Sequence, residues 1–224
     1  MVLCASTSLR FHNSVLSTGN DMRVLIVAKT HVHGRACVGG LALDDNRGLR
    51  LLESNGAHQP ADTAYEVGQI WDLDCRPSPH LTPPHVEDTL VLKGHIVGHV
   101  PNMREFLKRR VHPWRGAPNQ TFEDLVRPTY NGHGYVNDIM GVPAMSTGFW
   151  LPDRPLAYEV EEGKPYYRYP RDKGVRLLPY VGFAPPIDAI PAGTLVRLSL
   201  ARWWRPDNAS DVEARCYLQM SGWY

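Results

Sequence analysis

Nineteen glycines and nineteen prolines are spread along the whole of this 224-residue chain. Both residue types interrupt helices, so a helical bundle would not tolerate this number. Between them lie short apolar runs rich in β-branched residues, the pattern of strands that alternate with turns. The distribution therefore predicts a mainly β protein, and the length allows one large domain or two small ones.

The first hundred residues contain five predicted strands. They lie at about residues 23–28, 36–43, 49–52, 67–75 and 90–100. Residues 44–48 are rich in Asp, Asn and Gly and predict a turn, and Gly39 with Gly40 predicts a bulge or sharp bend. We expect a first barrel lobe over residues 22–100, preceded by a disordered leader or an upstream start at residues 1–21.

Residues 101–145 differ from both flanking segments. Asn102 can cap a helix at about residues 103–110, with Glu105 completing the cap, and Thr121 can cap a second short helix before Pro128. We expect a helical connector or insert here. Strand patterns return at residues 156–160, 166–169, 175–181, 194–204 and 213–220, which predicts a second barrel lobe over residues 146–224.

The charges are nearly balanced, with a formal net charge of +1, so binding of nucleic acid needs a local patch rather than a general cationic surface. The four cysteines are scattered and lack metal-binding spacing, which is typical of reduced thiols in a cytoplasmic protein. No apolar stretch of about 18 residues is present, so we expect no membrane partner.

Several blocks resemble a known family. RVLIVAK, HGRACVGGLAL and GLRLLE resemble the start of the bacterial dual OB-containing domain, and VGQIWDLDC with PPHVEDTLVL resembles the end of its first barrel. A strand carrying Lys164, Tyr166, Tyr167 and Arg168, followed by TLVRLSLARWW, is similar to its second barrel. The resemblance covers residues 22–100 closely and 146–205 loosely. It implies two OB barrels, no shared reaction, and nucleic acid as partner, often in bacterial defence. Residues 101–145 and the ending RCYLQMSGWY depart from the family pattern.

A basic loop follows the first predicted strand. Lys29 and Arg35 can contact phosphates there, and His31 and His33 can stack on bases or donate hydrogen bonds, as loop residues of OB barrels do. A solvated hairpin loop without a ligand would have the same composition. No other histidine or cysteine has the spacing to complete a metal site with His31 and His33, so we expect no metal.

Two tryptophans flanked by arginines end a predicted strand: Arg202, Trp203, Trp204 and Arg205. In a regular strand over residues 194–204, Trp204 would face the apolar side and Trp203 the more polar side. An exposed Trp203 would then stack on a base while the arginines contact phosphates. Alternatively, Trp204 closes the barrel and Trp203 packs beneath the helical insert.

A second aromatic and cationic group contains Tyr167 and Arg168. Neighbouring residues of a strand face opposite sides, so half of this group belongs to the core and the other half can join the tryptophan strand in one groove.

The densest basic run ends the predicted helix and contains Lys108, Arg109 and Arg110, with Arg115 beyond. The helix dipole favours cations at this end. The run is therefore either a helix-stabilising feature or a secondary nucleic-acid patch.

Motifs of catalysis are missing: there is no nucleophile elbow, phosphate-binding glycine loop, zinc-protease helix or deaminase pattern. Cys37 lies near Arg35 and His33 and can be an activated thiolate, although its apolar strand favours burial. We expect a non-catalytic module that binds DNA or RNA without a cofactor. Two alternatives stay open: a subunit that docks another protein through exposed aromatic residues, and a nucleotide-processing enzyme with a site between the lobes.

Overall fold

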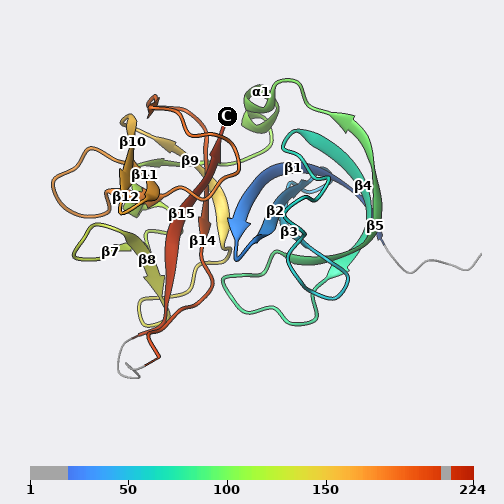
Figure 1. The fold of residues 1–224 in the computed structure, drawn as a ribbon, viewed down its shortest axis with the longest axis horizontal. Coiled ribbons are helices and arrows are strands. Elements are labelled where there is room, and N and C mark those ends of the chain that lie inside the picture. The colour runs from blue at the N-terminus through green and yellow to red at the C-terminus, as the bar shows by residue number, and fades with distance from the viewer. Residues whose placement is uncertain (1–19, 208–212) are drawn as a thin grey trace, which may run out of the picture.

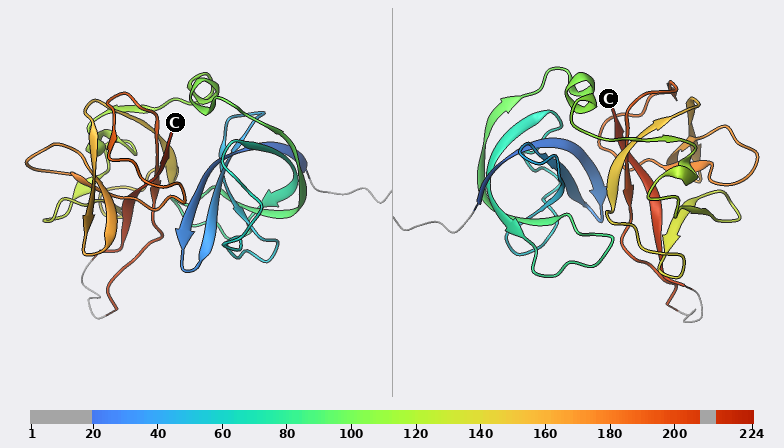
Figure 2. Two further views of the ribbon diagram at one scale, coloured as in Figure 1. Left: turned by 45° about the horizontal axis from the view of Figure 1, so that its top comes forward. Right: turned by 180° about the vertical axis from the view of Figure 1, so that it is seen from behind.

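The computed structural model describes residues 20–207 and 213–224 and consists of two β lobes that lie side by side (Figure 1). Two further directions show the same arrangement (Figure 2). The predicted fold class, mainly β with two OB-like lobes and a short helical segment, is confirmed. Of the predicted leader, residues 1–19 lie outside the described residues, whereas Asn20 and Asp21 belong to the first strand.

The first lobe is a closed barrel with the strand order β1-β2-β3-β5-β4. Its strands are β1 (Asn20–Val32), β2 (Arg35–Ala42), β3 (Gly48–Leu52), β4 (Gln69–Pro77) and β5 (Asp88–His99). Neighbouring strands are antiparallel except β3 and β5, which are parallel. The barrel closes because β1 is long enough to pair with β2 along one edge and with β4 along the other. Closure leaves no free sheet edge.

The apolar run in β1 is continuous because both faces of this strand are buried. Val24 and Ile26 point into the barrel core, and Leu25 and Val27 point into a second core shared with the other lobe. The register of β1 shifts between Ile26 and Ala28, opposite the glycine pair that predicted a bend in β2.

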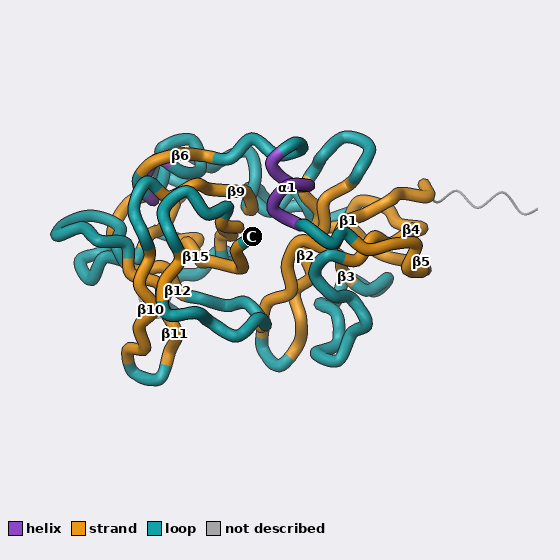
Figure 3. The backbone as a smooth tube through the Cα atoms, turned by 90° about the horizontal axis from the view of Figure 1, so that it is seen from above, coloured by secondary structure: helices purple, strands orange, loops and turns teal. Residues whose placement is uncertain are grey.

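A helix lies over the line where the lobes meet (Figure 3). This helix, α1 (Met103–Lys108), buries Leu107 in the shared core, together with Phe149 and Leu195 of the second lobe. The predicted capping residue Asn102 is confirmed, since its side chain accepts a hydrogen bond from the backbone N–H of Glu105. The Glu105 side chain, predicted to complete the cap, pairs with Lys108 instead. No helix in the described ranges is long and apolar enough to span a membrane.

The second lobe contains a six-stranded sheet, β6-β9-β14-β15-β8-β7, and a four-stranded sheet, β12-β11-β10-β13. Their bounds are β6 (Trp114–Gly116), β7 (Arg127–Pro128), β8 (Gly134–Asn137), β9 (Thr147–Pro152), β10 (Leu156–Glu161), β11 (Lys164–Arg168), β12 (Leu177–Pro179), β13 (Ala189–Ile190), β14 (Val196–Leu200) and β15 (Arg215–Trp223). The core of this lobe includes Trp150, Tyr167 and Leu198.

The predicted second helix after Thr121 is wrong. A short 3-10 turn (Pro118–Gln120) comes first, and Phe122, Glu123 and Asp124 then have positive φ angles of 51°, 57° and 61°. The reason is packing: the Phe122 ring is fully buried and lies 4.5 Å from the ring of Trp114. Strands β6, β7 and β8 also fall within residues 101–145 and were not predicted, because two to four residues are too few to show alternation. The domain boundaries at residues 100 and 145 stay predictions.

Candidate functional site

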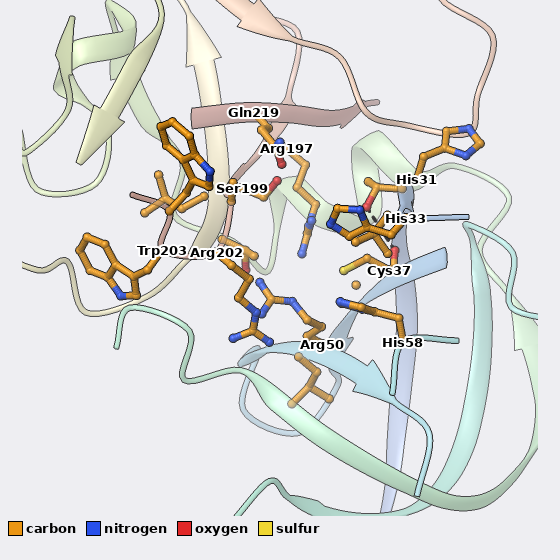
Figure 4. Close-up of a pocket in the computed structure, with 18 residues that line it drawn as sticks. His31, His33, Cys37, Arg50, His58, Arg197, Ser199, Arg202, Trp203 and Gln219 are labelled. Atoms are coloured by element: carbon orange, nitrogen blue, oxygen red, sulfur yellow. Dashed lines mark hydrogen bonds between the residues drawn. The ribbon is translucent and has the colours of Figure 1, made fainter. Parts of the chain in front are cut away.

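A cavity of about 470 Å³ lies between the two lobes. Its lining includes the arginines Arg50, Arg197 and Arg202, the histidines His31, His33 and His58, and Cys37. Arg197 reaches into this space from one side, and the guanidinium groups of Arg50 and Arg202 lie together on the other (Figure 4). None of the described lining residues is aspartate or glutamate. The cavity therefore presents positive charge from both lobes.

Arg197 is the second residue of β14 and is only 5% exposed. Its Nη1 donates to the hydroxyl of Ser221 over 3.2 Å, and within the described residues it forms no ion pair. A Cβ atom at Gly39 would lie 2.6 Å from Nη2, so the glycine leaves the space that the guanidinium occupies against β2. Burial lowers the pKa of Arg197, as expected for a cation removed from water.

Arg50 projects from β3 and is 6% exposed. Its Nη1 lies 2.9 Å from Asp88 Oδ1, and its Nη2 donates to Ser146 Oγ of the second lobe over 3.2 Å. Arg202 approaches the same carboxylate, with its Nη2 2.5 Å from Asp88 Oδ2. The Asp88 carboxylate thus pairs with two arginines. The buried Glu87 carboxylate also attracts Arg50 and Arg197, so two carboxylates face three arginines and an excess of positive charge is left.

His85 lies behind these arginines and is fully buried. Its Nδ1 accepts from Arg50 Nη2 over 3.4 Å, so the proton of the neutral ring is on Nε2. Burial, with the charges of Arg50 and Arg202, lowers the pKa of His85 to about 3. His85 is therefore neutral at pH 7 and adds no charge to the site.

Cys37 lines the cavity from β2 and is half-buried. Burial opposes ionisation of this thiol, but hydrogen bonding to His58 and the charge of Arg50 outweigh it and lower the pKa of Cys37 to about 7. His58 lies in the loop after β3 and also lines the cavity. A thiol of this pKa is about half ionised at neutral pH.

The tryptophan pair lies at the edge of the cavity, but the predicted orientations are reversed. Trp204 is 53% exposed, whereas Trp203 packs against the core of the second lobe and its Nε1 donates to the backbone carbonyl of Pro83 over 2.7 Å. The regular strand ends at Leu200, so its alternation does not extend to the pair. Arg205 is exposed and does not line the cavity.

The predicted basic loop is only partly at the site. His31 and His33 line the cavity, and His31 stacks on Phe183 with ring centroids 3.8 Å apart. Lys29 is buried and its Nζ lies 2.7 Å from Glu66 Oε1, while Arg35 Nη2 lies 2.5 Å from Glu53 Oε2. Neither Lys29 nor Arg35 is in the lining, because each is bound to a carboxylate of its own lobe.

The predicted groove that joins Tyr167 and Arg168 to the tryptophan strand is not formed. Tyr167 is fully buried in the core of the second lobe and its hydroxyl donates to the Ile187 carbonyl over 3.0 Å, so it cannot stack on a ligand. Arg168 pairs with Glu159 and Glu161 on the β10–β11 hairpin and is not in the lining.

The basic run at the end of α1 lies outside this cavity. Lys108 pairs with Glu105 over 3.0 Å, Arg109 donates to the Glu105 carbonyl, and Arg110 donates to the Leu43 carbonyl over 2.9 Å. Arg115 is exposed on β6.

A second cavity, of about 570 Å³, also lies along the line where the lobes meet and includes Arg110. It is larger than the first, but its lining carries Asp45, Glu87 and Glu123 as well as arginines. Its charge is therefore mixed, and the first cavity is the better site for an anion.

The prediction missed Arg50 and Arg197 as site residues, although the sequence carries a signal for both. Each is an arginine inside a short and mostly apolar strand, GLRLL and VRLSL. A charge at such a position is seldom placed there for solvation alone. In the part of the chain that is described, no group of three or more His, Cys, Asp or Glu side chains is arranged to hold a metal ion.

Comparisons with known proteins concern the whole chain. No curated protein sequence matches it. Among solved structures, the crystal structure of the p204 HINb domain is similar with a TM-score of 0.36 and 12% sequence identity, over 90% of this chain and 97% of that one. The family model of the dual OB-containing domain matches residues 22–223, nearly the full length. The chain therefore belongs to the dual OB-containing domain family.

Proposed function

We propose that this protein is a binding module that holds nucleic acid in the cavity between its two lobes. The observation that carries the proposal is the convergence of Arg50, Arg197 and Arg202 on a space whose described lining has no carboxylate. Guanidinium groups match phosphate oxygens in charge and geometry. The family resemblance supports a setting in bacterial defence, which we propose with it.

The exposed edge of the cavity supplies a contact for a base. The ring of Trp204 is 53% exposed beside Arg202, whose side chain is 46% exposed. Stacking of a base on an aromatic ring contributes roughly 1–3 kcal/mol and does not depend strongly on the base. Ser199 and Gln219, also in the lining, offer polar groups to base edges.

The small number of available arginines sets the expected salt dependence. For a single strand, the slope of log K against log salt is about −0.7 for each neutralised phosphate. Contact with two or three phosphates therefore predicts a slope of about −1.4 to −2.1. A protein partner docked through apolar groups would give a much smaller slope.

The test is fluorescence anisotropy with single-stranded and duplex DNA and RNA oligonucleotides at low salt. Trp204→Ala combined with Arg202→Ala should weaken binding at least about 10-fold. The matched control combines Tyr130→Ala and Arg154→Ala, an exposed aromatic residue and an exposed arginine of the second lobe that are not in the lining. The control should bind within about 2-fold of the wild type. Failure of the wild type to bind any oligonucleotide, or equal binding by the cavity variant and the control, would overturn the proposal.

A further inference from the structure

We propose that the buried end of this cavity receives a terminal phosphate monoester, so that the protein recognises the end of a nucleic-acid strand. This inference rests on the proposed function and names its ligand more closely. It comes from the difference in exposure among the side chains that line the cavity. Arg197 and Arg50 are 5% and 6% exposed, whereas Arg202 and Trp204 are about half exposed.

The buried end carries more positive than negative charge, even though the buried Glu87 carboxylate also attracts Arg50 and Arg197. Arg197 has a hydroxyl partner and no ion pair among the described residues, and Arg50 shares the Asp88 carboxylate with Arg202. Buried charges in proteins are normally paired or bound to an ion. An anionic ligand placed between Arg197 and Arg50 would supply the missing partner.

The charge and shape of a phosphate monoester fit this position better than those of an internal phosphodiester. A monoester carries about −1.5 to −2 charges at pH 7 and three free oxygens. An internal phosphodiester carries one charge, and the chain must continue from it in two directions. Two inward guanidinium groups therefore match the monoester.

Access to the buried end also favours a strand terminus. Arg197 lies against β2, where Gly39 leaves no room for even a methyl group beside the guanidinium. The cavity volume, about 470 Å³, falls in the range of roughly 300–1,000 Å³ that is usual for sites enclosing a small ligand. Such a space suits the last nucleotide of a strand, with the preceding base at the exposed Trp204.

The experiment compares one single-stranded sequence with a 5′-phosphate, with a 3′-phosphate, or with hydroxyls at both ends. The wild type should bind one phosphorylated form at least about 10-fold more tightly than the hydroxyl form. Arg197→Met should reduce this ratio to about one, and Arg154→Ala should preserve it. A nucleoside monophosphate and inorganic phosphate serve as competitors and should displace the phosphorylated oligonucleotide only at much higher concentrations.

Each outcome separates the two proposals. If no oligonucleotide binds, the proposed function fails. If all three forms bind equally, nucleic-acid binding stands and strand-end recognition is wrong. If the nucleoside monophosphate binds as tightly as the phosphorylated oligonucleotide, the ligand is a free nucleotide and strand-end recognition is again wrong.

A second variant guards against a folding defect in Arg197→Met. Gly39→Ala keeps every charge but places a methyl group where the Arg197 guanidinium lies, so the side chain must move. This variant should lower the discrimination between phosphorylated and hydroxyl ends several-fold while its circular dichroism spectrum and melting temperature stay close to wild type. An unchanged ratio in a folded Gly39→Ala protein would contradict the proposed position of the phosphate.

Discussion

Two groups of arginines in this molecule look alike in charge but differ in their partners. The run at the end of α1 is the densest in the sequence. Lys108 and Arg109 bind the side chain and the backbone carbonyl of Glu105, and Arg110 donates to the Leu43 carbonyl. The arginines of the cavity, Arg50, Arg197 and Arg202, are far apart in the sequence but converge in space. The Asp88 carboxylate forms ion pairs with two of them, Arg50 and Arg202. On this comparison we base the proposal that the cavity, with its unused hydrogen-bonding capacity, binds the ligand, rather than the denser run at the end of α1.

The largest expected effects differ in kind between the two groups: one substitution should reduce binding and the other should reduce stability. Arg197→Met should weaken binding of a phosphorylated oligonucleotide by about 100-fold without lowering the melting temperature, because it removes a buried charge that lacks an ion pair. Arg110→Met should leave binding unchanged but lower the melting temperature, because Arg110 links α1 to the Leu43 carbonyl and lies over the Phe106 ring. Anisotropy and thermal unfolding measure the two effects. Loss of both stability and binding in both variants would contradict the difference between the two groups of arginines.

The next effect concerns the exposed edge of the cavity. Trp204→Ala should weaken binding of single strands by about 10-fold, in keeping with the loss of one stacked base. Tyr130→Ala removes a fully exposed ring elsewhere on the second lobe and should have no effect. Titration of both variants with the same labelled oligonucleotide measures their affinities. Equal affinities would mean that Trp204 does not contact the ligand.

A several-fold difference is expected between the alkylation rates of two cysteines. The lowered pKa of Cys37, about 7, means that alkylation should be slow in acid, rise through pH 7 and level off above it, since only the thiolate reacts. Burial raises the pKa of Cys216 to about 12, so that thiol should stay unreactive over the same range. Peptide mapping after iodoacetamide treatment of a Cys4→Ser protein measures each rate. A Cys37 profile that begins to rise only near pH 9 would mean that the cavity lacks the positive charge described.

The smallest effect is expected at α1. Lys108→Ala combined with Arg109→Ala should change binding by less than about 2-fold, because both side chains are exposed and already bound to the helix that carries them. A loss of affinity greater than about 5-fold in the same anisotropy assay would mean that the ligand contacts the basic run at the end of α1 rather than the cavity.

Much of the fold could be predicted because its signals are local. Continuous apolar runs predicted β1 and β2, and Asn102 with Glu105 predicted the start of α1. The failures occurred where distant packing decides the conformation. Phe122 leaves the expected helix in order to bury its ring beside Trp114.

The candidate site was less predictable, for a related reason. Lys29 and Arg35 looked available, but Glu66 and Glu53, 37 and 18 residues away, bind them. Arg50 and Arg197 meet only because the lobes pack together through their shared core, and a single sequence does not show that contact. The orientation of Trp204 was also missed, because the end of β14 at Leu200 depends on pairing with β15.

The central claim is that the ligand occupies the cavity between the lobes, and Cys37 reports on that space directly. The decisive measurement is the alkylation rate of Cys37 at pH 7 with and without a saturating phosphorylated oligonucleotide. Anisotropy in the same sample records binding. If the ligand occupies the cavity, the alkylation rate of Cys37 should fall by at least about 5-fold, because the ligand shields the thiol and a bound anion raises the pKa of the thiol. Full binding with an unchanged Cys37 rate would contradict the account.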